Sequence, residues 1–292
     1  MTSFDVVRRI RRASGVRRVG HAGILDRPAT GVLPVAIGDC TRLIDALVEA
    51  RKRYRAEIVL GVETDTYDAS GTVVNTSDAS GATREAVLDT LEAFRGSFLQ
   101  TPPAYSAVKL DGERAYRAAR RGEQPKLAPR EVVAYRIDLA SFAARGDGTI
   151  ALTLEIECGK GFYVRSLAHD LGAGLGVGGH VSALRRTAVG PFAIEDATDL
   201  DTAAAMLEAG QTDELVHAPD AVLADWPALV LGQSSVVTLR TGRDVQLGVA
   251  SMVRAVAVGT RARAYGPDGK LVALVESGVA SGAWHPYRVL HS

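Results

Sequence analysis

The stretch "GHAGILDRPATGVLP", residues 20–34, carries a single carboxylate, Asp26, among glycines, prolines and small apolar residues. An aspartate in such a loop commonly bonds neighbouring backbone N–H groups and stabilises a turn. The alternative is nucleophilic catalysis by the carboxylate, which requires an ionised oxygen held away from other acids and from solvent. Catalysis would therefore require a partner cation from elsewhere in the chain.

Arg165 is the candidate for that cation. It stands in "GKGFYVRSLAHDLG", residues 159–172, at the start of a predicted helix that follows a strand and a glycine turn. A guanidinium group matches the two oxygens of a carboxylate and fixes its orientation. An exposed arginine on a helix is the commoner interpretation of such a residue, so the pairing with Asp26 is a hypothesis.

Hydrophobic periodicity predicts the elements that must position these two residues. A helix capped by Ser3 ends near residue 14, and Thr83 and Gly96 mark the two ends of another helix. Further helices are expected at 39–50, 163–176 and about 200–215, and strands at 54–62, 131–142 and 149–158. This order favours an α+β fold, with a mixed or antiparallel sheet flanked by helices, over a doubly wound fold.

Composition indicates two domains. We predict a catalytic domain over residues 1–225, from which a segment rich in Pro, Tyr and Arg, about 102–130, projects towards a partner. Residues 226–292 contain short strands and glycine turns at about ten-residue spacing, which predicts a small C-terminal β-barrel.

The composition is that of an ordinary globular protein, with 47% hydrophobic and 23% charged residues. Cys40 and Cys158 lie far apart without metal-ligand spacing, so we expect neither a metal site nor a disulfide framework. No apolar run approaches the roughly 20 residues of a membrane span, and the N-terminus has no signal-peptide core. We therefore predict a cytoplasmic protein without a membrane partner.

The charge is unevenly distributed. The net charge of the chain is +0, yet residues 1–55 hold twelve Lys and Arg against five acids, a local charge of +7. A solvated face is the commoner meaning of such a run, and a polyanion such as RNA is the alternative.

Five segments in order resemble the bacterial tRNA pseudouridine-55 synthase (TruB) family, which modifies the T-loop uridine. They are "GHAGILDRPATGVLP", "KRYRAEIVLGVETDTYDASG", "PPAYSAVKLDGERAYRAAR", "GKGFYVRSLAHDLG" and "HVSALRRTAVGPF". The resemblance covers the chain to about residue 200. It is weaker over the tail, which resembles the family's RNA-binding β-barrel of PUA type.

The resemblance implies a role for each matching position. Asp26 matches the catalytic aspartate, Arg165 its paired arginine, and Tyr54 the tyrosine that stacks on the target base. Leu184 matches an apolar wall of the uracil pocket, and His21 the histidine that enters the T-loop. Asp68 matches an acid near the pocket, and Tyr163 joins the substrate-binding set.

The implied activity isomerises uridine to pseudouridine in the T-arm of tRNA, without cofactor or metal. The carboxylate would act at the ribose, by attack on C1′ or by removal of the C2′ proton. We expect a monomer. The alternatives are a catalytic subunit guided by a second RNA and a non-catalytic tRNA-binding or folding chaperone.

Two features depart from the family pattern. Family members commonly begin with a strand and a Lys-Pro turn, and Met1, Thr2 and Ser3 fall where that segment ends, so we expect reduced stability. Pro28 shifts the rigid residue of the Asp26 loop by one position. The spacing from Asp26 to Gly31 is unchanged, and the catalytic assignment is kept.

Overall fold

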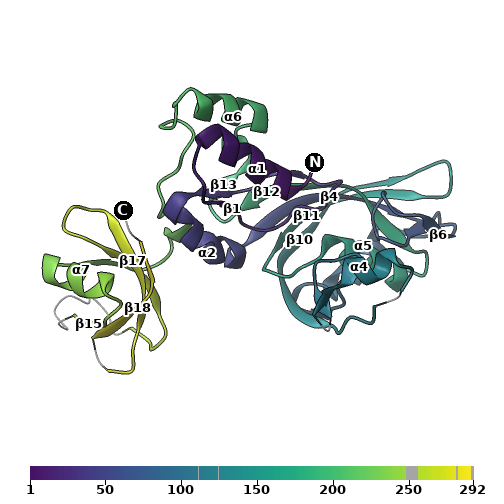
Figure 1. The fold of residues 1–292 in the computed structure, drawn as a ribbon. Coiled ribbons are helices and arrows are strands. Elements are labelled where there is room, and N and C mark those ends of the chain that lie inside the picture. The colour runs from purple at the N-terminus through teal and green to yellow at the C-terminus, as the bar shows by residue number, and fades with distance from the viewer. Residues whose placement is uncertain (111, 124, 248–255, 281, 291–292) are drawn as a thin grey trace. The chain divides into compact units, whose positions relative to one another are not determined.

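The computed structural model describes residues 1–110, 112–123, 125–247, 256–280 and 282–290 (Figure 1). The chain forms two compact units. Unit 1 comprises Met1–Ile24, Pro34–Val48 and Thr198–Ser292, and unit 2 comprises Leu25–Leu33 and Glu49–Ala197. The boundary at residue 225 stays a sequence-based prediction. Parts of the predicted segments 102–130 and 226–292, at 111, 124, 248–255, 281 and 291–292, lie outside the described residues.

A seven-stranded sheet forms the centre of unit 2. Its order is β13-β12-β4-β11-β10-β7, with β2 beside β12. The strands are β2 (Thr30–Gly31), β4 (Lys52–Leu60), β7 (Gly96–Gln100), β10 (Arg130–Ala144), β11 (Ile150–Cys158), β12 (Gly179–Val189) and β13 (Phe192–Ala193). All pairs are antiparallel except β2 with β12. The predicted mixed sheet of an α+β fold is confirmed.

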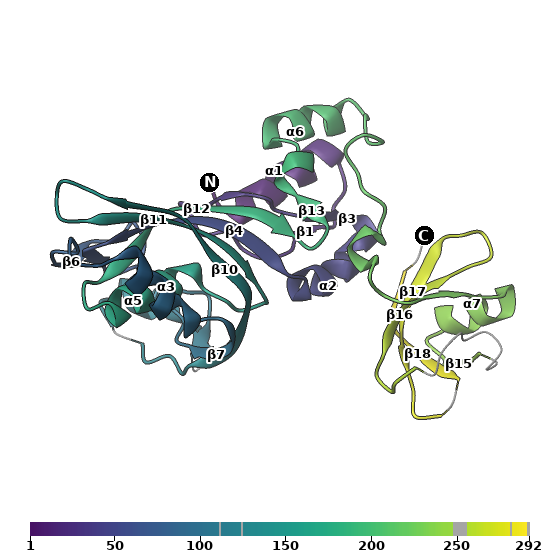
Figure 2. The same ribbon diagram turned by 180° about the vertical axis from the view of Figure 1, so that it is seen from behind.

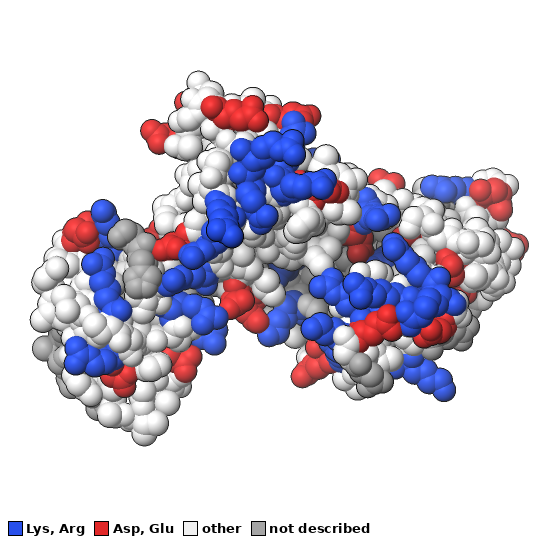
Figure 3. Space-filling view, in the orientation of Figure 1, with Lys and Arg blue, Asp and Glu red and all other residues white. Residues whose placement is uncertain are grey.

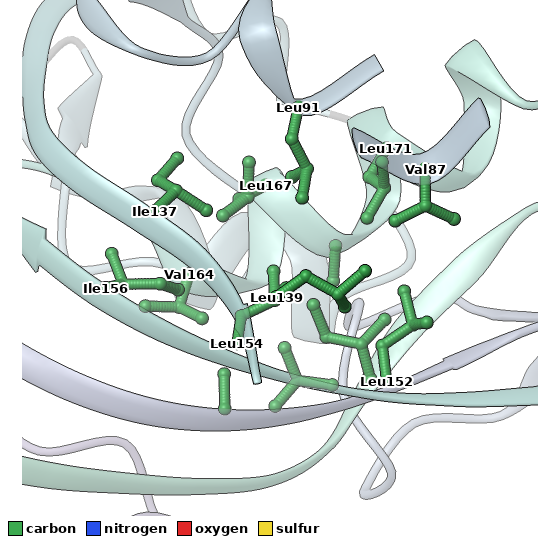
Figure 4. Close-up of a cluster of buried hydrophobic side chains, with 14 of the residues drawn as sticks. Val87, Leu91, Ile137, Leu139, Leu152, Leu154, Ile156, Val164, Leu167 and Leu171 are labelled. Carbon is green, nitrogen blue, oxygen red and sulfur yellow. The ribbon is translucent and has the colours of Figure 1, made fainter. Parts of the chain in front are cut away.

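Helices α3 (Arg84–Glu92) and α5 (Val164–Gly174) lie on the same side of this sheet (Figure 2). Their apolar side chains meet those of β10 and β11 in one buried cluster, which includes Leu91, Leu154 and Leu167 (Figure 4). Burying one such leucine contributes about 1.5–3 kcal/mol. The predicted cap at Thr83 is confirmed, because its hydroxyl accepts the N–H of Ala86 at 3.2 Å.

Shorter elements complete unit 2. Two hairpins pair β5 (Val62–Thr64) with β6 (Val73–Thr76) and β8 (Lys109–Leu110) with β9 (Glu113–Arg114). The short helix α4 (Ala115–Arg120) lies within the predicted projecting segment. Helix α3 ends four residues before Gly96, which instead begins β7.

In unit 1, helix α1 (Ser3–Ser14) packs against α6 (Leu200–Glu208) and against the ladder of β1 (Val19–His21) and β3 (Val35–Ile37). The prediction that Ser3 caps α1 was wrong. Thr2 is the cap, because its hydroxyl accepts the N–H of Asp5 while the Asp5 carboxylate accepts the N–H of Thr2. The predicted helix over 39–50 begins as a 3-10 turn, Gly38–Leu43, before α2 (Ile44–Glu49).

The C-terminal part of unit 1 contains a five-stranded sheet that is curled into a half-barrel. Its order is β14 (Ala228–Val230), β16 (Arg261–Tyr265), β17 (Leu271–Ser277), β18 (Ala283–Val289) and β15 (Val245–Gln246). Helix α7 (Gln233–Arg240), which the sequence did not predict, buries Leu239 against Trp284 and the sheet core. Across the described ranges, no helix is long and apolar enough to span a membrane.

Candidate active site

The Asp26 loop is fixed by its C-terminal end. The Asp26 carbonyl accepts the N–H of Ala29 at 3.0 Å, which closes a turn, and β2 then pairs in parallel with β12. Gly31 has φ of 108° and lies so close to β12 that an added Cβ would be 2.1 Å from the carbonyl oxygen of Arg186. Only glycine fits there, so this position sets where the loop leaves the sheet edge.

Arg165 holds the Asp26 carboxylate. Its Nε donates to Asp26 Oδ2 at 2.8 Å, and the pairing proposed from the sequence is therefore present. The other two guanidinium nitrogens donate to backbone carbonyls, Nη1 to Thr66 and Nη2 to Tyr105, both at 3.1 Å. Three different segments thus fix the guanidinium group.

The two partners differ in exposure. The Arg165 side chain is 6% exposed, whereas the Asp26 side chain is 38% exposed. A charge-assisted hydrogen bond to a fixed donor orients the carboxylate. The accessible member of the pair is therefore the carboxylate, which can act on a ligand that approaches from solvent.

Asp68 is buried beside the same guanidinium. Its Oδ2 lies 3.6 Å from Arg165 Nη1, while Oδ1 accepts from the Thr66 hydroxyl and from the Ser70 N–H, both at 2.9 Å. Its backbone forms a bridge with Val181 of β12. Asp68 is 5% exposed, so its position suits it to hold the loop and Arg165 rather than to contact a ligand.

Tyr54 and Arg186 face one another across β4 and β12. Burial raises the pKa of Tyr54 to about 12, and the hydrogen bond and charge of Arg186 oppose part of that effect. The Tyr54 hydroxyl is therefore protonated at neutral pH. Arg186 is 1% exposed and its Nε donates to the Val32 carbonyl at 2.8 Å, so it joins this tyrosine to the end of the Asp26 loop.

Two further predicted residues lie in unit 2. Tyr163 precedes α5, and its backbone is held by Gln100 through bonds of 2.8 and 3.0 Å. Burial raises the pKa of Tyr163, and the negative charge of Asp26 acts in the same direction. Leu184 on β12 is half-buried against the unit 2 core.

His21 belongs to unit 1, where it ends β1 and pairs with Val35. The structure therefore brings Asp26, Arg165 and Asp68 into one contact group in unit 2, with Tyr54 and Tyr163 near enough to sense the Asp26 charge. His21 is not part of that described group.

Arg186 was not predicted as a site residue from the sequence. Along β12, Ala183 and Arg185 are exposed whereas Leu184 is half-buried and Arg186 is buried. An arginine on the inward face of an alternating strand could have indicated such a residue. A buried charge requires hydrogen-bond or ion-pair partners inside the protein. The contacts of Arg186 join Tyr54 to the end of the Asp26 loop.

Positive side chains gather over α1 and over α4 (Figure 3). In unit 1, α1 contributes Arg8, Arg9 and Arg12 to a surface depression of about 460 Å³. In unit 2, four arginines lie within α4 or at its two ends: Arg114, Arg117, Arg120 and Arg121. Within the described ranges, no three His, Cys, Asp or Glu side chains come together to hold a metal ion.

Two family models match the chain. The N-terminal domain of the TruB family of pseudouridylate synthases matches residues 11–164, and the C-terminal domain of tRNA pseudouridylate synthase B matches residues 165–226. Similar proteins carry the name tRNA pseudouridine synthase B. That of Dehalococcoides mccartyi is 37% identical over 100% of this chain and 93% of its own length. The protein of Arthrobacter sp. is 41% identical over 94% of this chain and 88% of its own length.

Solved structures agree with this grouping. A chain of a Cbf5-Nop10-Gar1 complex superposes with a TM-score of 0.72 and 26% identity, over 96% of this chain and 76% of that chain. A chain of an H/ACA RNP bound to a substrate RNA shares the fold, with a TM-score of 0.74 and 23% identity. The match covers 100% of this chain and 82% of that chain. With family models that meet at residues 164 and 165 and relatives similar over nearly their whole length, the chain belongs to the TruB family of pseudouridylate synthases.

Proposed function

We propose that this protein isomerises uridine to pseudouridine in tRNA, at position 55 of the T-loop, with Asp26 as the catalytic carboxylate. The observation that carries the proposal is the partly exposed Asp26 carboxylate held at 2.8 Å by a buried arginine. The curated relatives that are 37–41% identical over most of the chain are named tRNA pseudouridine synthase B.

The reaction is an internal rearrangement. The bond between N1 and C1′ breaks, the uracil turns, and a bond forms between C5 and C1′; C5 then loses its proton and N1 takes one up. One oriented carboxylate at the ribose suffices to assist the first bond cleavage, because uracil leaves as a delocalised anion. Charge-assisted binding to Arg165 keeps the carboxylate directed at the ribose instead of at the bulk solvent.

The target base is buried within a folded RNA loop and must be extruded. Tyr54 would then offer a ring on which the base stacks, a contact of about 1–3 kcal/mol. Tyr163 and Leu184 would line the same site, and His21 would contact the T-loop. The arginines of α1 and α4 would hold phosphates, which supply affinity but little sequence information.

The test is tritium release from tRNA labelled at C5 of uridine. We expect release by the wild-type protein and none by Asp26→Asn, while both bind tRNA with similar affinity. A transcript with cytidine at position 55 would report the site, because it should give no release. An isolated T-arm hairpin should be a substrate and an anticodon-arm hairpin should not.

Each alternative predicts another result. A non-catalytic chaperone would bind tRNA, and neither the wild type nor Asp26→Asn would release tritium. A guide-dependent subunit would release tritium only after a guide RNA is added, whereas we expect release from naked transcript. We also propose a monomer that acts in the cytoplasm, which sedimentation and cell fractionation would test.

A further inference from the structure

Helix α5 contacts the loop of residues 64–71 at two points. Arg165 donates to the Thr66 carbonyl at 3.1 Å, and His169 stacks on the Tyr67 ring with the centroids 4.0 Å apart. Residues four apart lie on one face of a helix. The two basic side chains therefore hold neighbouring residues of the same loop.

Both ring nitrogens of His169 face carboxylates. Nε2 lies 3.1 Å from Glu63 Oε1, and Nδ1 lies 3.1 Å from Asp170 Oδ1. A neutral imidazole has only one N–H, so its second nitrogen would direct a lone pair at a carboxylate oxygen. The geometry fits the imidazolium form, which donates to both. The titratable groups that face the ring are Glu63 from β5, Tyr67 from the loop and Asp170 from α5 itself.

Tyr67 has an unusual backbone. Among the described residues it is the only non-glycine residue with a positive φ, of 61°. A tyrosine keeps such a conformation only where its surroundings hold it. Its carbonyl accepts the N–H of Val181 at 3.0 Å, and its ring rests against His169. The next residue is Asp68, whose carboxylate lies 3.6 Å from Arg165.

We infer that His169, as an imidazolium, is a positioning residue for the Asp26–Arg165 pair. It binds Glu63 and Asp170 and supports Tyr67 in its left-handed conformation, so that Thr66 and Asp68 stay within reach of the Arg165 guanidinium. The kinetic part of this inference rests on the proposed function, and the structural part does not.

The ring is 26% exposed, so its charge is only partly screened by solvent. The hydrogen bond to Asp170 raises the pKa of His169 above its ordinary value, burial opposes this, and the charges of Asp170 and Glu63 add to the increase. The charged ring therefore stabilises the folded protein. This stabilisation is fully present below the pKa that the histidine has in the unfolded chain, and it is lost as the pH rises through the raised pKa of the folded state.

The first test compares His169→Gln with His169→Arg by tritium release. We expect kcat to be about tenfold lower for His169→Gln, because the Asp26–Arg165 pair is less well positioned. KM should stay within twofold of wild type, because the contacts to the base and the phosphates remain. Arginine is a permanent, planar cation that stacks on an aromatic ring and donates to two carboxylates. His169→Arg should therefore keep kcat within about threefold of wild type. The exposed His217→Gln is the control and should change neither constant.

The second test uses pH. As the pH rises through the raised pKa of His169, kcat of the wild type should fall relative to that of His169→Arg, since only histidine loses its charge. A His169→Gln protein with wild-type kcat would overturn the inference. So would a loss of kcat that His169→Arg fails to restore while its thermal unfolding stays native.

The third test needs no activity. Nitrogen-15 NMR of the free protein should show both His169 ring nitrogens protonated at pH 7. An unprotonated nitrogen would contradict the imidazolium that binds Glu63 and Asp170. Hydrogen exchange of the Ala69 N–H, which donates to Val181 at 2.9 Å, should be faster in His169→Gln. If the wild type releases no tritium, the proposed function fails, yet these two measurements still decide the role of His169.

Discussion

The site pairs a fixed cation with an accessible anion. Arg165 makes three hydrogen bonds to three segments, whereas Asp26 receives one of them and keeps part of its side chain in solvent. Removing Arg165 would also leave the buried Asp68 carboxylate without its counter-charge, and an uncompensated buried charge is strongly destabilising. Arg165 therefore stabilises the loops around it as well as orienting the Asp26 carboxylate.

Arg165→Lys should separate charge from geometry. A lysine ammonium is a point charge on a flexible stem and cannot reproduce the guanidinium fork. We expect kcat to fall on the order of 100-fold and the free energy of unfolding to fall by about 2–4 kcal/mol. Tritium release and urea unfolding measure the two effects.

The control is Arg55→Lys, because Arg55 forms an ion pair with Glu155 at 2.8 Å but its side chain is 54% exposed. Surface pairs contribute about 0–1 kcal/mol, so its stability should hardly change. An Arg165→Lys protein as active as the wild type would contradict the proposed orientation role.

Tyr54 should titrate late. Its pKa of about 12, which burial raises, predicts that the difference in phenolate absorbance between wild type and Tyr54→Phe is absent below about pH 10. Tyr116 is the contrast, since a hydrogen bond from Arg117 lowers its pKa and Tyr116→Phe should remove an earlier titration. Early ionisation of Tyr54 would mean that its ring is not enclosed as described.

At the scale of elements, the sequence predicted those whose pattern is uniform. Strand β11 alternates buried and half-buried side chains along its whole length, and its neighbour β10 carries buried residues at regular intervals in its middle; both strands were expected. Strand β12 was not, because Arg186 interrupts its inward apolar face. Helix α7 was hidden in a stretch of small polar and β-branched residues, which favour helix weakly.

The site was predictable only in part, for a related reason. Asp26 and Arg165 are separated by 139 positions, and spacing in the sequence gives no contact at that range. The residue types made Arg165 one candidate partner, and the resemblance of the motifs to a family favoured it. The carbonyl acceptors at Thr66 and Tyr105 depend on loop conformation rather than on residue type, so the sequence could not reveal them.

Gly31→Ala should disrupt the junction of β2 with β12. Its φ is 108° and the new Cβ would lie 2.1 Å from the Arg186 carbonyl oxygen, so the strand must move. We expect a loss of about 2–4 kcal/mol in the free energy of unfolding, the upper range for single substitutions. Activity should fall as well, because the Asp26 loop depends on this junction.

Gly96→Ala is the matched control for that substitution. Gly96 also has a positive φ, 74°, but an added Cβ would meet nothing within 4 Å. Only the backbone preference is then lost, about 1 kcal/mol. Equal losses for the two variants would show that the close approach at Gly31 is not the cause.

At the scale of the whole molecule, net charge conceals the distribution of charge. The chain has 34 Lys and Arg residues and 34 Asp and Glu residues, yet basic side chains gather over α1 and over α4 (Figure 3). A polyanion responds to such local surfaces within a screening length of about 8–10 Å. Neutral overall composition is thus compatible with a nucleic-acid partner.

Salt dependence of tRNA binding tests this point. Replacing Arg117 or Arg120 by Ala should reduce the slope of log affinity against log salt by about 1, as for one lost phosphate contact. Arg121→Ala should change it less, since Glu113 and Glu123 already neutralise Arg121 at 2.7 Å. Slopes that stay unchanged in all three variants would place the RNA away from α4.

The order of the chain through the two units has a consequence for assembly. Unit 2 takes residues 49–197 as one continuous stretch, but Asp26 reaches it on a separate excursion of only nine residues, Leu25–Leu33. The polypeptide connections on both sides confine this excursion, so the carboxylate is supplied to its arginine at a high effective concentration. A chain cut on both sides of that segment would have to recruit it as a free peptide, and its activity would become dependent on the peptide concentration.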